Sequence, residues 1–516
     1  MGTLQDSAKR RLAVAMIVRD EAAVLAETID SIREVADDLF VLDTGSTDDT
    51  IRIAESSGAR VATVPWTDDF SAARNGALDQ LDSEWVLWLD AGEQLTEESQ
   101  SALRQFVDSE ADPDRVYMLM VVVPTADGSS SPEQAAQMRL MPNRPELRFE
   151  GRVRETLEPA IERQDLIIEM APGRIDRHRR DLDPTRKTAK AQRDIRLVTL
   201  ECSDTLEPPV RLLLAVGEAC SNLGEVEKAR QMYSQAVRQA ERGSTDMLDA
   251  YYGLLTTYDA DPSLCDEQLS AGLEALEVYP LDAQLLCAMG SYLQNQGRLD
   301  LAERAFETAV LHGQVDLETW HLSEIAEMAV VCLALTQQLA QKPDQARTVL
   351  LDALDRFPES DRVRRHLVDL LVKLGRSQEA LGFIGPLAGT MGTAEPWRNA
   401  VLGACKGAQK DWLGALGYLQ SAYVGGCRDP FCLRWLVVTL ISSGQLDAAR
   451  PVLNEWLARE PANAEALAYF ERMEEASADE DDRRLRLDAG NAAGQTVTPV
   501  LPSIDTTTTG AAEAEA

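Results

Sequence analysis

The stretch Trp85-Val-Leu-Trp-Leu-Asp-Ala-Gly-Glu93 decides the fold of the N-terminal part of this chain. Its first five residues are apolar, which predicts a short buried strand. The strand runs directly into the carboxylate of Asp90. Open α/β sheets bind ligands outside the carboxyl ends of their strands. We therefore expect Asp90 to lie at the edge of a sheet where chemistry takes place.

Strand-like and helix-like segments alternate around this stretch. Short apolar runs predict strands at 12–18, 39–42, 60–64, 116–123, 137–141, 147–149 and 166–169. Apolar residues at helical spacing predict helices at 21–35, 49–57, 70–81 and 97–107. Repeated units of strand and helix specify a mostly parallel sheet with helices on both faces. The prediction is an α/β, Rossmann-like domain over residues 12–200, preceded by an extension of residues 1–11.

From about residue 205 the pattern is helical throughout and repeats itself. In the first copy Gly217, Ala229 and Ala236 stand where a two-helix repeat of 34 residues needs small side chains, with Tyr233 between them. Further copies begin near residues 249, 283, 327, 361, 395 and 430, with an insertion near 312–322. The pattern resembles the tetratricopeptide repeat (TPR). It predicts an all-α solenoid of about seven hairpins over residues 205–472. A disordered acidic and Thr-rich tail over residues 474–516 is expected to follow.

Composition limits the functional classes. The 516 residues include 51 Lys or Arg and 86 Asp or Glu, for a formal net charge of −35. Binding to nucleic acid or to anionic membranes needs basic surface, so we expect neither. No apolar run reaches the ~18 residues of a transmembrane helix, so we expect no integral membrane segment. The eight cysteines form no CxxC motif, and we expect them as buried thiols in a reducing compartment, the cytoplasm.

Four motifs within residues 12–93 occur in an order typical of one enzyme family. They are Met16-Ile-Val-Arg-Asp-Glu21, Leu42-Asp-Thr-Gly-Ser-Thr-Asp48, Trp66-Thr-Asp-Asp-Phe-Ser-Ala-Ala-Arg-Asn75 and Trp88-Leu-Asp-Ala-Gly-Glu93. Together they resemble the family 2 glycosyltransferases, and among these the SunS-like bacterial branch, which often carries TPR repeats. The resemblance implies a GT-A fold. It also implies inverting transfer of a sugar from a nucleoside-diphosphate sugar to an acceptor.

The resemblance places the nucleoside of the donor at the ends of the first two strands. It implies that Asp43 accepts a hydrogen bond from the base and that Arg19 and Glu21 line the same pocket. It also brings Arg74 and Asn75 close to the nucleotide. From the residues alone, Asp43 can also be a turn residue before a helix, and Arg74 a surface residue with local partners.

Asp90 matches the first acid of the family's DxD motif, in which acids bind ribose and a divalent metal. Mg²⁺ or Mn²⁺ suits this task because hard cations prefer carboxylate and phosphate oxygens. Gly92 replaces the second acid, so either Glu93 reaches the metal with its longer side chain or metal binding is weakened. His178 stands where GT-A enzymes commonly place a late metal or phosphate ligand. The resemblance therefore implies a metal set of Asp90, Glu93 and His178, although a lone histidine can also be structural.

Two later segments supply the remaining candidates. Phe149-Glu-Gly-Arg-Val-Arg-Glu155 resembles the family stretch in which a glycine, here Gly151, approaches the sugar and an acid follows. By that resemblance Glu155 is the general base, and an exposed acid at a helix start is the alternative. Residues 174–196 contain nine Lys or Arg and four Asp. This basic block, with Arg179 as a donor ligand, either neutralises the diphosphate or pairs with the acidic solenoid.

Two functions from different classes remain open at this point. The first is a cytoplasmic glycosyltransferase of the hexosyltransferase type, whose solenoid binds a protein or peptide. The second is a degenerate transferase domain retained in a scaffold, an alternative that Gly92 and Arg154 motivate. A nucleotidyltransferase is disfavoured, because such enzymes usually begin with a Gly-rich, basic phosphate loop.

Overall fold

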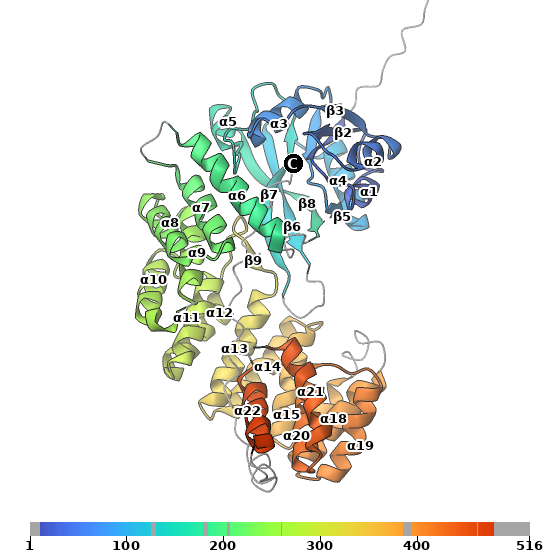
Figure 1. Ribbon diagram of the computed structural model, residues 1–516, viewed down its shortest axis with the longest axis vertical. Coiled ribbons are helices and arrows are strands. Elements are labelled where there is room, and N and C mark those ends of the chain that lie inside the picture. The colour runs from blue at the N-terminus through green and yellow to red at the C-terminus, as the bar shows by residue number, and fades with distance from the viewer. Residues whose placement is uncertain are drawn as a thin grey trace, which may run out of the picture. The chain divides into compact units, whose positions relative to one another are not determined.

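The computed structural model describes residues 11–124, 131–178, 184–203, 207–259, 261–384, 394–461 and 463–478. These residues divide into two compact units (Figure 1). The first unit contains the described residues up to Tyr279 together with residues 315–323. The second contains residues 280–314 and the described residues from Glu324 onwards.

The first unit is built on one mixed β-sheet. Its described strands lie in the order β3-β2-β1-β4-β7-β6-β8-β5, with β9 paired to β7. They are β1 (Leu12–Val18), β2 (Asp38–Asp43), β3 (Arg60–Thr63), β4 (Trp85–Trp88), β5 (Glu93–Leu95), β6 (Arg115–Val123), β7 (Glu133–Pro142), β8 (Ile167–Arg177) and β9 (His321–Leu322). Strands β1 to β4 run parallel, whereas β7 runs antiparallel to β4 and to β6. The expected parallel arrangement therefore covers the first four strands, and the sheet as a whole is mixed because β7 reverses direction.

Helices cover both faces of this sheet, so β1 is buried on both sides and reads as a continuous apolar run. One face packs against α1 (Leu25–Asp30), α2 (Thr50–Ser56) and α4 (Glu97–Ser109). The other face packs against α3 (Phe70–Leu78), α5 (Glu158–Arg163), α6 (Pro184–Glu201) and α7 (Val210–Asn222) (Figure 1). The side chains of β1 alternate between these two cores.

Several segments differ from the sequence-based expectation, among them the following three. The helix expected over residues 21–35 is limited to α1, with turns on both sides. Residues 147–149 form no strand, because the backbone of Phe149 bonds to the side chain of Asn75 rather than to a neighbouring strand. β8 continues well past the expected end at residue 169 and reaches Arg177.

Two helical hairpins complete the first unit. They consist of α7, α8 (Val226–Gln239), α9 (Thr245–Asp259) and α10 (Cys265–Val278), with the short helix η1 (Pro262–Leu264) before α10. Gly217 of α7 shows why small residues recur in this part of the chain. A Cβ atom at this position would lie 2.7 Å from the ring of Tyr233 on α8. The two helices therefore cross more closely than any side chain at residue 217 would allow.

The second unit is also built from helical hairpins. Its described helices are α11 (Ala283–Asn295), α12 (Leu299–His312), α13 (Ile325–Leu339), α14 (Pro343–Arg356), α15 (Asp361–Lys373), α16 (Ser377–Gly382), α18 (Ala394–Ala408), α19 (Trp412–Val424), α20 (Pro430–Ser442), α21 (Leu446–Arg459) and α22 (Ala464–Ala478). Gly290 faces Phe306 as Gly217 faces Tyr233, because a Cβ atom at residue 290 would lie 2.7 Å from the ring. The predicted class, an α/β domain followed by an all-α repeat region, is confirmed.

α22 extends over the first residues of the expected tail, and residues 479–516 lie outside the described part of the chain, as do residues 1–10. Among the helices that the structure describes, we find no apolar stretch of the length that a membrane crossing requires.

Candidate active site

The loops that follow β1 and β2 are held together by side-chain hydrogen bonds to backbone. Asp20 donates its N–H to Ser46 Oγ over 2.9 Å and accepts the N–H of Thr47 at Oδ1 over 2.7 Å. The N–H of Glu21 donates to Thr50 Oγ1 over 2.7 Å. The first two motifs therefore form one surface at the carboxyl ends of their strands.

Asp43 combines the two roles that the sequence left open. Its Oδ1 accepts the N–H groups of Gly45 and Ser46 over 2.9 and 3.0 Å, which makes it a turn residue. Its Oδ2 is buried and has no hydrogen-bond partner among the described residues. A buried acceptor without a donor is costly, so Oδ2 is the atom that a ligand donor would satisfy. Beside it, Glu21 is buried and Arg19 is exposed.

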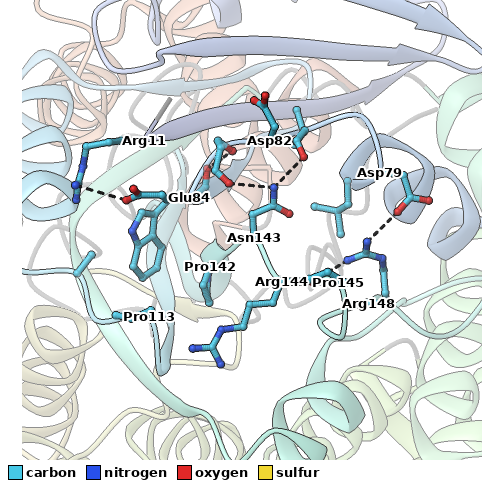
Figure 2. Close-up of a pocket in the computed structure, with 15 residues that line it drawn as sticks. Arg11, Asp79, Asp82, Glu84, Pro113, Pro142, Asn143, Arg144, Pro145 and Arg148 are labelled. Atoms are coloured by element: carbon cyan, nitrogen blue, oxygen red, sulfur yellow. Dashed lines mark hydrogen bonds and ion pairs between the residues drawn. The ribbon is translucent and has the colours of Figure 1, made fainter. Parts of the chain in front are cut away.

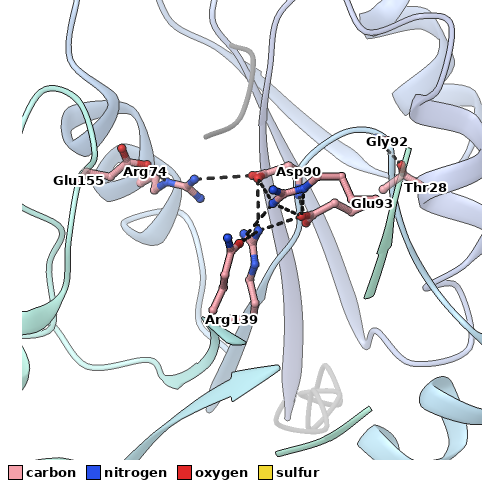
Figure 3. Close-up of polar contacts among 9 residues, drawn as sticks. Thr28, Arg74, Asp90, Gly92, Glu93, Arg139 and Glu155 are labelled. Carbon is pink, nitrogen blue, oxygen red and sulfur yellow. Dashed lines mark hydrogen bonds and ion pairs between the residues drawn. The ribbon is translucent and has the colours of Figure 1, made fainter. Parts of the chain in front are cut away.

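Asp90 lies two residues beyond β4, is buried, and is surrounded by arginines. Its carboxylate oxygens lie 3.4 Å from Arg139 Nη2 and 3.6 Å from an Nη2 atom of both Arg74 and Arg177. Burial opposes ionisation of Asp90, but the charges of Arg139, Arg74 and Arg177 outweigh it and lower its pKa. Asp90 is therefore a carboxylate at neutral pH. Figure 3 shows Arg74 and Arg139 reaching it from different sides.

Glu93 is buried and both of its carboxylate oxygens are engaged. Oε1 accepts from Arg139 Nη2 over 2.8 Å and from Arg177 Nε over 2.9 Å. Oε2 accepts the backbone N–H of Asp90 over 2.9 Å. The side chain of Glu93, the first residue of β5, thus connects β7, β8 and the loop after β4. Figure 3 shows its contact with Arg139.

The backbone conformation explains why residue 92 is a glycine. The N–H of Glu93 donates to the carbonyl of Asp90 over 3.0 Å, and Gly92 inside this turn has φ +94°. Only glycine adopts this conformation without steric cost. Its N–H donates to Thr28 Oγ1 over 2.9 Å, and its carbonyl accepts the N–H of His178 over 3.0 Å. An acid at this position would strain the turn that carries Glu93.

The expected metal set of Asp90, Glu93 and His178 does not form. Both oxygens of Glu93 are engaged by donors, and His178 is exposed and tied to the turn by its backbone. No group of three or more His, Cys, Asp or Glu in the described part of the chain is arranged to hold a metal ion. Three guanidinium groups also surround Asp90 and repel a cation. In this arrangement the residues present therefore do not fit a divalent metal at Asp90 and Glu93.

Arg74 connects Asp90 with Glu155. It forms an ion pair with Glu155 through Nε and approaches Asp90 through Nη2, and its guanidinium stacks over Trp88 and Phe149 at 4.9 and 5.3 Å from the ring centroids. The side chains of Arg74 and Glu155 are only 6% and 2% exposed. The alternatives of a surface arginine and an exposed acid are therefore wrong. Glu155 Oε2 is buried without a hydrogen-bond partner among the described residues.

Three further candidates from the sequence are Asn75, Gly151 and Arg179. Asn75 uses both ends of its amide on the backbone of Phe149, over 2.9 Å each, and so positions the segment that leads to Glu155. Gly151 has φ +100°, and a Cβ there would lie 2.9 Å from the guanidinium of Arg211 on α7. The close approach at Gly151 is thus made by a helix that follows the sheet domain. Arg179 lies outside the described residues.

Arg139 and Arg177 were not singled out from the sequence. Arg139 had a local signal, because it is a charged residue inside the otherwise mostly apolar end of β7. Arg177 belongs to the predicted basic block, but nothing local distinguishes it from its basic neighbours. Their shared partner, Glu93, lies 46 and 84 residues away in the chain.

The segment of residues 315–323, between α12 and α13, returns to the sheet of the first unit. Its strand β9 pairs with the start of β7, His321 opposite Gln134 and Leu322 opposite Glu133. The indole ring of Trp320 lies 5.7 Å from the guanidinium carbon of Arg177. The insertion between two helical repeats therefore contacts a residue of the site.

A surface depression of about 800 Å³ is lined by Trp85, Pro142 and Asn143, among others (Figure 2). Trp85 begins β4, so this depression lies at the opposite end of the strand from Asp90. Its rim is closed by an ion pair between Arg148 and Asp79 over 2.8 Å. None of the sequence-predicted site residues lines it, and we assign no chemistry to it.

Comparison with known proteins finds two family models that match parts of the chain. Residues 13–153 match the family model "Glycosyl transferase family 2", and residues 333–384 match "Tetratricopeptide repeat". A TPR repeat-containing protein of Synechococcus elongatus is 36% identical over 155 residues, which cover 30% of this chain and 37% of that protein.

Several relatives carry the name glycosyltransferase, and two of them follow. An uncharacterized glycosyltransferase of Rickettsia felis is 32% identical over 115 residues, 22% of this chain and 40% of the relative. The SPbeta prophage-derived glycosyltransferase SunS of Bacillus subtilis is 29% identical over 90 residues, 17% of this chain and 21% of the relative. The chain thus spans less than half the length of each of these relatives.

Proposed function

We propose that the chain transfers a sugar from a nucleoside-diphosphate sugar to an acceptor, with inversion at the anomeric carbon. The proposal is supported by the match to a glycosyltransferase family 2 domain ahead of tetratricopeptide repeats. The observation that carries the proposal is the link from Asp90 through Arg74 to Glu155. It joins the fourth motif to the later acid within one buried cluster beside the ends of the first two strands.

The nucleoside end of the donor is assigned to the loops after β1 and β2. Asp43 Oδ2 is a buried acceptor without a donor, and a base N–H would satisfy it. Asp43 Oδ1 already holds the turn, so the side chain is fixed in place before a ligand arrives. Asp90 Oδ1, which accepts no hydrogen bond from the described residues, suits a ribose hydroxyl in the same way.

The chemical step is one direct displacement at the anomeric carbon of the donor. The acceptor oxygen forms a bond to this carbon while the bond to the diphosphate oxygen breaks, and the nucleoside diphosphate leaves with the bonding electrons. The acceptor proton passes to Glu155 Oε2, the carboxylate oxygen that Arg74 leaves unpaired. The ion pair with Arg74 keeps Glu155 oriented for this transfer.

The acceptor and the compartment belong to the same proposal. TPR arrays offer surfaces to peptides and helices, so we assign a protein or peptide partner to the helical region. All eight cysteines are free thiols, and most are buried, which supports a reducing compartment such as the cytoplasm.

A second candidate, the degenerate domain in a scaffold, is favoured by one observation. The Glu155 side chain is 2% exposed and already paired, so an acceptor reaches it only if the surrounding segment moves. Calorimetry of the full-length chain with UDP- and GDP-sugars separates the two candidates. Binding of one donor that is lost in Asp90→Ala and kept in Asp79→Ala, at the end of α3, supports the transferase. Absence of binding with every donor supports the scaffold.

A further inference from the structure

We infer that Arg139 and Arg177 take the place and the charge of a divalent cation, so that the donor diphosphate is bound by guanidinium groups and without a metal. The inference rests on the proposed function and concerns the same site. It follows from the disagreement between the family's metal motif and the partners that Asp90 and Glu93 have here.

The geometry places both arginines where a metal would have to bind. Arg139 Nη2 lies 3.4 Å from Asp90 Oδ2 and 2.8 Å from Glu93 Oε1. Arg177 Nη2 lies 3.6 Å from Asp90 Oδ2, and its Nε lies 2.9 Å from Glu93 Oε1. Both guanidinium groups therefore bridge the two carboxylates that remain of the acidic motif.

The charge balance also supports the replacement of a divalent cation by the two arginines. Two carboxylates that hold one divalent cation form a neutral group, and two carboxylates that pair with two guanidinium groups are neutral as well. A cation that entered this cluster would meet two buried positive charges and would have to displace them. Such repulsion is strong at a site shielded from water, because the effective dielectric constant is low.

Guanidinium groups can also do what the metal does for the donor. Arginine presents several N–H donors in a planar fork that matches phosphate oxygens. The Nε–H of Arg139 is buried and has no acceptor among the described residues. This N–H group is therefore available to donate a hydrogen bond to a phosphate oxygen of the sugar donor.

Two neighbours hold this pair of arginines in position. Gln137 Oε1 accepts from Arg139 Nη2 over 2.7 Å and from Arg177 Nη2 over 3.3 Å. Trp320 stacks on Arg177, and β9 secures the segment that carries it to β7. Arg139 and Arg177 are 5% and 11% exposed, so their orientation is set by packing rather than by solvent.

The test is calorimetry on the full-length chain with UDP and GDP as probes, in EDTA and in Mn²⁺. The affinity of the diphosphate that binds is expected to agree within about twofold between the two conditions. Arg139→Met and, as a second variant, Arg177→Met are each expected to weaken diphosphate binding at least about tenfold. Binding of the matching nucleoside should stay unchanged, which separates lost phosphate contacts from a damaged fold. Arg144→Met, at a surface pair with Asp114, is the control.

The outcomes are distinct. Binding that EDTA abolishes and Mn²⁺ restores overturns the inference and leaves the proposed function standing, as does diphosphate binding that both arginine variants retain in full. Absence of binding for both probes, and for every sugar donor, overturns the proposed function and the inference with it.

Discussion

Arg139 Nη2 lies 2.8 Å from Glu93 Oε1, and both side chains are almost completely buried. An ion pair of this kind is costly to break, since the remaining charge stays buried without its partner. It also engages the one acid that could have substituted for the missing second acid of the DxD motif. The electrostatics of the site therefore depend on this contact, and the following predictions start from it.

Glu93→Gln is expected to destabilise the first unit by about 3 kcal/mol, because Arg139 and Arg177 lose their shared carboxylate. The unfolding temperature of the full-length chain, followed by calorimetry, measures the effect. Glu84→Gln is the control, since its ion pair with Arg11 is 3.5 Å long and partly exposed. That change should cost less than about 1 kcal/mol. Equal effects of the two substitutions would show that the Glu93 contacts carry no special weight.

Gly92→Asp restores the acidic motif in sequence, but we expect it to restore no metal binding. The turn requires φ +94°, which costs a non-glycine residue about 1–2 kcal/mol. Gly58→Asp is a control for the backbone strain alone, because Gly58 has φ +93°, is exposed and has open space around it. Gly92→Asp should be destabilised more, because Gly92 is buried and the new carboxylate would lie next to Asp90 and Glu93. Titration with Mn²⁺ should detect no binding to either, and tight binding by Gly92→Asp alone contradicts the account.

Two substitutions of Asp43 are expected to separate its contribution to stability from its contribution to donor binding. Asp43→Asn keeps an acceptor oxygen for the turn but loses the charge at the second position, so stability should be nearly unchanged. Donor affinity should fall at least about tenfold, as expected for a lost charge-assisted hydrogen bond. Asp43→Ala should in addition destabilise the chain by about 1–2 kcal/mol, because two N–H groups lose their acceptor. Thermal unfolding and calorimetry test the two properties separately, and an Asn variant with full donor affinity rules out the proposed role of Oδ2.

Asp249 on α9 makes stability depend on pH. Burial, together with the nearby charges of Asp246, Asp316 and Glu218, raises its pKa to about 7. In the unfolded chain an Asp carboxyl titrates near about 3.9, so folding loses stability as the pH rises from about 4 to about 7. Asp249→Asn removes this loss. It should stabilise the chain at pH 8 by at least on the order of 1 kcal/mol, and by less at pH 5. Unfolding temperatures of the wild type and the variant at the two pH values test this. The same stabilisation at pH 5 and at pH 8 would contradict it.

The positions of the motif residues could be predicted because they are local. Asp43 and Asp90 follow apolar runs directly, and the carboxyl ends of parallel strands meet at one edge of a sheet. The partners of Glu93 could not be predicted, because Arg139 and Arg177 reach it from β7 and β8 only after the sheet has formed. The roles of Asn75 and Gly151 were hidden for the same reason. Asn75 bonds to the backbone of Phe149, and Gly151 is approached by Arg211 of a helix that belongs to the repeats.

The central claim, that the buried cluster around Arg74 carries out sugar transfer, is tested most directly by release of nucleoside diphosphate from a bound sugar donor. The wild-type chain should release the diphosphate. Glu155→Gln should bind the donor normally and release the diphosphate at least about 100-fold more slowly, the usual weight of a general base. Equal rates for the two proteins, or no release by the wild type with any donor that binds, would contradict the account.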